Sequence, residues 1–205
     1  MNQLFRGKPV RRLWAKVFTA SMALRVPTAF VVLLVSLSGT WSQADESSSG
    51  SKFTLNDAQA FVDYHNRVRK RVGVGEVRWS EELAKYAQEW ADHLAETGEF
   101  LHRPSSGEWA QDYGENLAIH GSIIQCAEAW ASEQEHYTET QPTPADFAKF
   151  KAGHYTQMVW QSTKRIGAGV ATVRNGQFAG LKLVVCNYDP AGNIIGEKPY
   201  ANLDD

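Results

Sequence analysis

Gly153-His154-Tyr155-Thr156-Gln157-Met158-Val159-Trp160 and Cys186-Asn187-Tyr188-Asp189-Pro190-Ala191-Gly192-Asn193 are the two stretches that decide the fold of this chain. The first places a histidine, a glutamine and a tryptophan within about two helical turns. The second ends an apolar strand in a turn rich in proline, glycine and asparagine. Packing alone explains neither stretch, so both are candidates for a functional site.

The first half of the domain is predicted to contain two helices with a short strand between them. Apolar residues at helical spacing predict a helix over about 55–71, with Thr54 as its N-cap. A strand is expected over 74–79. Ser80 then caps a second helix, which ends at Gly98 because glycine is the usual residue just past a helix end.

A long loop over about 99–120 follows the second helix, and loops of this length are usually functional. A third helix is expected over about 123–137. A proline-containing loop then leads to a short helix near Phe147, and a further helix begins at His154.

The C-terminal part is predicted to be a β-hairpin, with strands over 167–173 and 177–188 and a turn at Arg174-Asn175-Gly176. The second strand has apolar residues on both faces, so we expect it to be covered on both sides. Helices that precede a two-sided hairpin indicate an α+β domain with a small, largely antiparallel sheet between helical layers.

Residues 1–44 have the pattern of an export signal. They contain six basic residues and no acidic residue, an apolar run at 29–37, and a small-x-small motif at Ser42-Gln43-Ala44. The apolar run is shorter than the roughly 20 residues of a membrane span. We expect a signal peptide over 1–44, with an uncleaved signal anchor as the alternative, then a polar linker over 45–52 and one domain over 53–205.

Charge excludes some partners. The chain has 21 Lys and Arg and 23 Asp and Glu, and six of the basic residues lie in 1–44, so the remainder has 15 basic against 23 acidic residues, a net charge of −8. Such an acidic domain is a poor ligand for nucleic acid or for anionic lipid. Export permits a disulfide between Cys126 and Cys186, but the sequence leaves open whether they pair, and Cys186 also fits as a small core residue.

Glu133 is the clearest chemical signal in the residues themselves. Its spacing places it on the helical stripe of Cys126, Trp130 and Tyr137, which is otherwise apolar. A carboxylate there needs a partner, or it lies at the edge of the stripe and reaches water. His154, His102 and Glu115 are further candidates, from a semi-buried helix and from the long loop. The sequence has no zinc-protease motif, nucleophile elbow or phosphate-binding loop.

The chain resembles the CAP superfamily, which comprises cysteine-rich secretory proteins, antigen 5 and plant pathogenesis-related class 1 proteins. The resemblance rests on both opening stretches, Tyr64-His65-Asn66-Arg67, Gly114-Glu115-Asn116-Leu117-Ala118, and the Trp130, Glu133, Tyr137 pattern. It implies a three-layer α-β-α sandwich with a large groove. It also implies that His102, Glu115, Glu133 and His154 line this groove and can bind a divalent metal such as Zn²⁺.

The resemblance leaves several functions open. We expect a secreted protein, periplasmic if the source is a Gram-negative bacterium, that binds a sterol or fatty acid or acts in defence or virulence. A loop over 138–151 is a candidate cover for a lipid cleft. The alternatives are a metal-assisted peptidase with Glu115 or Glu133 as general base, and a precursor that releases Pro190–Tyr200 as a signalling peptide. A binding protein is favoured over an enzyme, and the oligomeric state is open.

Overall fold

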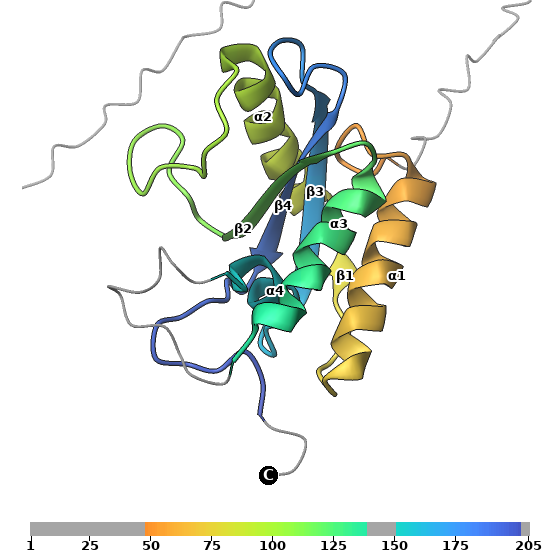
Figure 1. Ribbon diagram of the computed structural model, residues 1–205, viewed down its shortest axis with the longest axis vertical. Coiled ribbons are helices and arrows are strands. Elements are labelled where there is room, and N and C mark those ends of the chain that lie inside the picture. Colours follow the sequence, from red (N-terminus) through yellow and green to blue (C-terminus); the bar gives the residue numbers. More distant parts are fainter. Residues whose placement is uncertain (1–47, 139–150, 202–205) are drawn as a thin grey trace, which may run out of the picture. The chain divides into compact units, whose positions relative to one another are not determined.

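The computed structural model describes residues 48–138 and 151–201 (Figure 1). The predictions of a signal peptide over 1–44 and of a short helix near Phe147 lie outside the described residues, as do most of the linker and of the loop over 138–151. No helix of the described part is long and apolar enough to cross a membrane.

Helix α1 (Leu55–Arg71) begins where it was predicted, because Thr54 and Asp57 form a capping box. The Thr54 side chain accepts a hydrogen bond from the Asp57 N–H, and the Asp57 carboxylate accepts one from the Thr54 N–H. Phe61 and His65 on its inner face are fully buried. Helix α1 therefore packs through the predicted stripe.

The sheet contains four strands in the order β1-β3-β4-β2. The strands are β1 (Arg78–Trp79), β2 (Gly114–His120), β3 (Arg165–Thr172) and β4 (Lys182–Asp189). Strand β4 pairs antiparallel with β3 and with β2, and only the short β1 runs parallel to β3. The prediction of a small, largely antiparallel sheet is confirmed.

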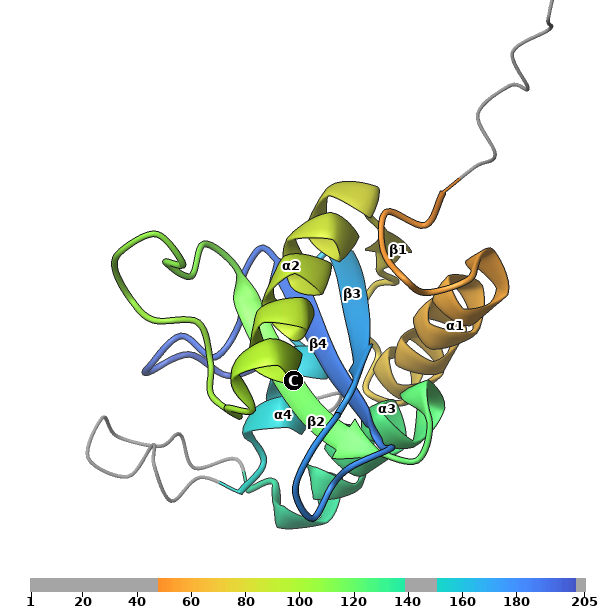
Figure 2. The same cartoon turned by 90° about the horizontal axis from the view of Figure 1, so that it is seen from above.

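Helices cover both faces of the sheet, as Figures 1 and 2 show. Helix α2 (Glu81–Thr97) covers the face to which Leu183 and Val185 point. Helices α1, α3 (Ile123–Ser132) and α4 (Gly153–Met158) cover the face of Val184, Cys186 and Tyr188. The second hairpin strand is thus apolar on both faces because helices cover both, as predicted. The three-layer α-β-α sandwich is confirmed.

Two glycines allow α2 to lie directly on the sheet. A Cβ atom at Gly167 would overlap the backbone of Ala84, and one at Gly169 would overlap the backbone of Gln88. Glycine is needed at both positions because the helix backbone, not a flexible side chain, occupies the space.

Several predicted bounds were wrong. The loop over 99–120 was expected to lack structure, but its end is strand β2, which pairs with β4 along its whole length. Helix α3 ends at Ser132 rather than near Tyr137, because a 3₁₀ turn, η1 (Glu133–His136), follows it. The strand expected over 74–79 forms only at its end, as β1.

The hairpin differs from its prediction in length. Strand β4 begins at Lys182 rather than at 177, and the connection bends back on itself through the hydrogen bonds from Val173 N–H to Leu181 O and from Gly180 N–H to Val173 O. Gly176 has the positive φ expected of a turn glycine. Cys126 and Cys186 are buried free thiols, which answers the question of whether they pair.

Candidate functional site

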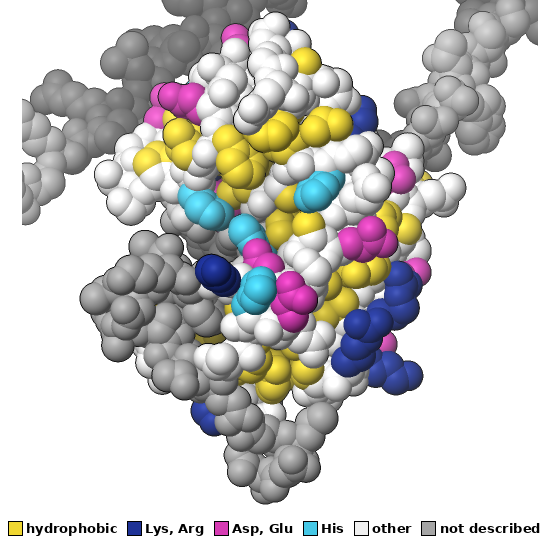
Figure 3. All heavy atoms as spheres, in the orientation of Figure 1, with side chains coloured by type: hydrophobic (Ala, Val, Ile, Leu, Met, Phe, Trp, Pro, Cys, Tyr) yellow, Lys and Arg dark blue, Asp and Glu magenta, His cyan; other side chains and the backbone are white. Residues whose placement is uncertain are grey.

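A groove of about 430 Å³ crosses the end of the sheet where β2 begins and β4 ends. All four predicted site residues line it. Its walls come from the loop before β2, from β2, η1 and α4, and from the loop after β4, and every lining residue is polar or glycine: His102, Gln111, Gly114, Glu115, Asn116, Glu133, Lys151, Gly153, His154, Gln157, Gly192 and Asn193. Figure 3 shows histidine and acidic side chains gathered in the middle of one face, beside a basic side chain.

The first pair of site residues is His102 and Glu115. The His102 Nδ1 lies 2.8 Å from the Glu115 Oε1, which also accepts a hydrogen bond from the Arg103 N–H. The Glu115 side chain is fully buried, whereas that of His102 is 54% exposed. Because a carboxylate only accepts, Nδ1 carries the proton and the Nε2 of a neutral His102 is left as an electron-pair donor.

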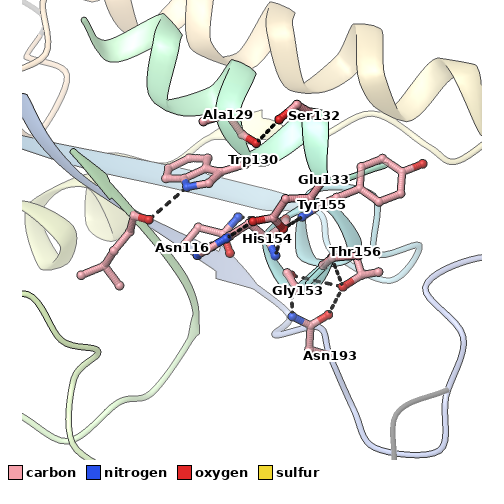
Figure 4. A network of polar contacts seen from close by, with 12 residues as sticks. Asn116, Ala129, Trp130, Ser132, Glu133, Gly153, His154, Tyr155, Thr156 and Asn193 are labelled. Atoms are coloured by element: carbon pink, nitrogen blue, oxygen red, sulfur yellow. Dashed lines mark hydrogen bonds and ion pairs between the residues drawn. The ribbon is translucent and has the colours of Figure 1, made fainter. Parts of the chain in front are cut away.

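The second pair is His154 and Glu133, shown in Figure 4. The His154 Nδ1 lies 2.6 Å from the Glu133 Oε1, and the backbone N–H groups of His154 and Tyr155 donate to Oε2. The Trp130 ring stacks near the His154 imidazole, with centroids 6.2 Å apart. The partner of the Glu133 carboxylate is therefore His154, and the Nε2 of His154 is left free of the carboxylate.

A buried arginine supports the first pair. The guanidinium carbon of Arg103 lies 3.8 Å from the ring centre of Tyr86 and 5.3 Å from those of Trp90 and Trp109. Its Nη2 donates to the Tyr86 carbonyl oxygen at 2.6 Å. Burial lowers the pKa of Arg103, and its neighbours Tyr86 and Glu115 oppose that shift. This clamp fixes the chain directly after His102.

A hydrogen-bond chain through the core supports the second pair. The His65 Nδ1 donates to the Phe61 carbonyl oxygen, so its Nε2 accepts from the Tyr188 hydroxyl at 3.0 Å. The Asn116 amide donates both to that hydroxyl and to the His154 carbonyl oxygen. Asn116 thus connects α4 to the sheet, beside the groove.

Further polar contacts hold the loop after β4 against α4. The Asn193 amide donates to the Gly153 carbonyl oxygen, and its Oδ1 accepts from the Thr156 hydroxyl (Figure 4). The Gln157 Oε1 accepts a hydrogen bond from the Gly192 N–H at 2.9 Å. This loop therefore forms one wall of the groove.

The four predicted residues are arranged as two separate His–Glu pairs. Within the described residues, no three His, Cys, Asp or Glu side chains are gathered closely enough to hold a metal ion together. Each carboxylate instead accepts from one imidazole, as in the carboxylate–histidine pairs that orient metal ligands in proteins. The residues that fit a metal ion directly are thus the two histidines.

The sequence analysis assigned no role to several residues of this site, among them Arg103, Gln157 and Gly192. Arg103 gave no signal in the sequence, because its burial among aromatic residues depends on the fold. Gln157 and Gly192 lie inside the two opening stretches but were given no role. Their signal was a polar amide in an apolar run and a glycine directly after Pro190-Ala191.

The fold and the site define the class of the protein: an α-β-α domain with two His–Glu pairs in one groove. The chain matches the Cysteine-rich secretory protein family, CAP, over residues 62–188, and it belongs to this family. The match includes His102, Glu115, Glu133 and His154.

Two plant relatives show the same relationship. Pathogenesis-related protein 1C of Nicotiana tabacum is 38% identical over 156 residues, which cover 74% of this chain and 86% of the relative. Pathogenesis-related protein 1 of Arabidopsis thaliana is 36% identical over 145 residues, which cover 69% and 81%. The chain is therefore similar to pathogenesis-related class 1 proteins over most of their length.

Among solved structures, the crystal structure of NaASP2 with Zn²⁺ is similar in fold, with a TM-score of 0.60 and 25% identity. The similarity covers 73% of this chain and 87% of that chain. Both the sequence and the fold place the protein in one superfamily, as its motifs predicted.

Proposed function

We propose that the protein is an extracellular binding domain whose groove holds a divalent metal ion, Zn²⁺ first, through His102 and His154. The observation that carries the proposal is the shared arrangement of the two histidines. Each has its Nδ1 fixed by a carboxylate and its Nε2 free in the same groove. Neutral imidazole with a carboxylate on its other nitrogen is a common zinc ligand.

The donor set fits a metal that keeps exchangeable ligands. Two imidazoles supply fewer donors than the four of a structural zinc site, so water or a bound molecule completes the shell. The two glutamates orient the histidines and offset the positive charge of the ion. A bound metal would act as a Lewis acid toward that molecule. NaASP2, of similar fold, was crystallised with Zn²⁺, which supports the choice of ion.

Isothermal titration of the full chain with Zn²⁺ tests this proposal. One ion should bind per chain, and His102→Ala or His154→Ala should each weaken binding at least about tenfold, since each removes one of two ligands. His120→Ala is the matched control, because His120 is exposed at the far end of β2. Equal affinity of the wild type and both site variants would reject the proposal.

Export and a role in defence or virulence are further parts of the proposal. The basic, apolar and small-x-small pattern of 1–44 supports export. Similarity to pathogenesis-related proteins of tobacco and Arabidopsis supports the role. Mass spectrometry of the exported protein should find a new N-terminus near Ala44, and an intact residue 1 would indicate a signal anchor instead.

A sterol or fatty acid remains a candidate ligand of the domain, though the groove does not favour it. An apolar molecule gains from burial against apolar walls, and the groove is lined by polar residues and glycine. The test is the binding of a fluorescent sterol or palmitate analogue. Saturable binding that His102→Ala and His154→Ala leave unchanged would locate a lipid site elsewhere.

Metal-assisted peptide hydrolysis is the second candidate. Two imidazole ligands leave positions open on an ion, which catalysis requires. Glu115 has one oxygen, Oε2, free of hydrogen bonds within the described residues, and so suits a general base better than Glu133. Glu115→Gln should abolish any peptidase activity and leave folding intact.

A precursor role is the least supported candidate. Within Pro190–Tyr200, Gly192 and Asn193 are hydrogen-bonded to α4, and the Gln161 N–H donates to the Pro199 carbonyl oxygen at 2.7 Å. Release would remove a wall of the groove. An intact C-terminus in the exported protein, measured by mass spectrometry, would argue against it.

A further inference from the structure

Two buried polar atoms in the groove have no hydrogen-bond partner within the described residues. They are Oε2 of Glu115 and Nε2 of Gln157. Both residues line the groove, the Glu115 side chain is fully buried, and Gln157 is 1% exposed. Buried polar atoms are nearly always paired, so an acceptor and a donor left together indicate a partner that enters the groove.

The orientation of the Gln157 amide is fixed by its surroundings. Because the Gly192 N–H donates to Oε1, the other end of the amide must be the NH₂ donor. Space beside it depends on glycine, since a Cβ atom at Gly192 would lie 2.8 Å from Nε2 and one at Gly114 would overlap Oε1. Two glycines thus leave the room that the Gln157 amide occupies.

The backbone of Glu115 adds a second donor and acceptor. Strand β2 is an edge strand. The backbone N–H and C=O groups of Ile166 and Val170 in β3 form hydrogen bonds on the side away from β4. Because the direction of these groups alternates along each antiparallel strand, the pairing register shows which groups of β2 point away from β4. In β2 the groups of Glu115 and Leu117 therefore face outward. Trp130 agrees with this, because its Nε1 donates to the Leu117 carbonyl oxygen.

Of these outward groups, the Glu115 N–H and C=O are bonded to no described residue, whereas the Leu117 C=O is occupied by Trp130. The unpaired stretch of the edge therefore coincides with the groove. It offers one backbone donor and one backbone acceptor. Beside them lie the Glu115 Oε2 and the Gln157 Nε2, which have no hydrogen-bond partner within the described residues.

We propose that the groove binds an extended peptide that lies along the outer edge of β2, opposite Glu115. One peptide group pairs with the Glu115 backbone as an added strand. Neighbouring peptide groups donate an N–H to the Glu115 Oε2 and offer a C=O to the Gln157 Nε2. The proposal assigns a ligand class to the groove of the proposed function, yet none of its contacts requires a metal ion.

The groove selects among ligands by its alternating hydrogen-bond donors and acceptors and by its charge. A sterol carries a single hydroxyl and cannot satisfy donors and acceptors that alternate along an edge, whereas every peptide group carries one of each. Glu115 and Glu133 outnumber Lys151 in the lining. We therefore expect peptides without acidic side chains to bind best.

The test is a titration of the ¹⁵N-labelled full chain with acetyl-tetraalanine amide in the presence of EDTA, followed by NMR. The Gln157 side-chain amide and the Glu115 and Gly192 backbone amides should shift and saturate with one dissociation constant. Acetyl-tetrasarcosine dimethylamide keeps the carbonyl groups but has no N–H, so it should cause no saturable shift.

Variants separate this proposal from the metal proposal. Gln157→Met removes the Nε2 donor at similar size, together with the Oε1 that accepts from the Gly192 N–H, and should weaken peptide binding about tenfold in the presence of EDTA, where no metal ion contributes. Gln161→Met is the control, because Gln161 is exposed in the turn after α4 and does not line the groove. Absent saturable shifts, equal binding of the sarcosine peptide, or full affinity in Gln157→Met would each overturn the proposal, whatever Zn²⁺ does.

Discussion

The histidines of the groove depend on buried polar residues beside them. Arg103 holds the chain after His102 by stacking on Tyr86 and by hydrogen bonding to its carbonyl oxygen. Asn116 holds the carbonyl oxygen of His154. At the residue scale the site is thus built by buried polar groups, each of which has partners that a substitution would strand.

Replacement of Arg103 by lysine should destabilise the domain. Lysine keeps the charge but loses the planar stacking on Tyr86, so we expect a loss of about 1–2 kcal/mol in the free energy of unfolding. Urea denaturation measures it. Arg174→Lys on the exposed hairpin connection is the matched control and should change little. Equal stability of the Arg103 variant would show that the clamp is unimportant.

His65 should make stability depend on pH. Burial lowers its pKa from 6.5 to about 4, because the charged imidazole is disfavoured in the core. The unfolded chain therefore binds the proton first as the pH falls. The free energy of unfolding that the neutral His65 contributes above pH 6.5 is lost progressively as the pH falls toward 4. The full pKa shift corresponds to a loss of about 3 kcal/mol.

The measurement for His65 is urea denaturation at intervals between pH 7 and pH 4. A His65→Gln variant should lack this part of the pH dependence, although it will be less stable at pH 7 because the Tyr188 contact changes. His120→Gln, at an exposed position, is the control. Parallel curves for wild type and His65→Gln would contradict the assignment.

At the scale of elements, the domain depends on the close contact of α2 with β3. Gly167→Ala should destabilise it by at least about 1–3 kcal/mol, since the added methyl meets the rigid backbone at Ala84. Thermal unfolding checks this. Gly75→Ala is the control, as a Cβ there meets only the Lys164 Nζ at 4.0 Å. A neutral Gly167 variant would mean that the layers are looser than described.

The elements also show where sequence patterns succeed. Thr54, Ser80 and Gly98 were sufficient to locate α1 and α2, because caps act over a few residues. Strand β2 was missed because Glu115 and Asn116 place polar side chains on both faces, so the strand has no apolar alternation. Those residues are polar because they build the site, and functional needs override the pattern.

The end of α3 was missed for a different reason. The stripe of Trp130, Glu133 and Tyr137 continues at helical spacing after the backbone has changed to a 3₁₀ turn at Glu133. Periodicity records which side chains face inward and is insensitive to such a change in winding. The spacing therefore left open whether Glu133 is paired or reaches water, and the structure pairs its carboxylate with His154.

At the scale of the whole molecule, the groove joins residues that are distant in the chain. Residues 102 and 115 belong to the loop before β2 and to β2 itself, and 133 and 154 belong to η1 and α4. No spacing rule links them, so only the resemblance to a family predicted that they meet. Their grouping into two His–Glu pairs was not predicted, because it depends on how β2, η1 and α4 meet at one end of the sheet.

X-ray absorption at the zinc edge of the Zn²⁺-loaded full chain tests the central claim most directly. The account predicts two imidazole nitrogens at about 2.0–2.1 Å, with the remaining ligands being oxygens that exchange with solvent. The imidazole signal should be lost in a variant with both His102→Ala and His154→Ala, and kept in His120→Ala. A spectrum with no imidazole, or one unchanged in the double variant, would contradict the claim that these two histidines form the metal site.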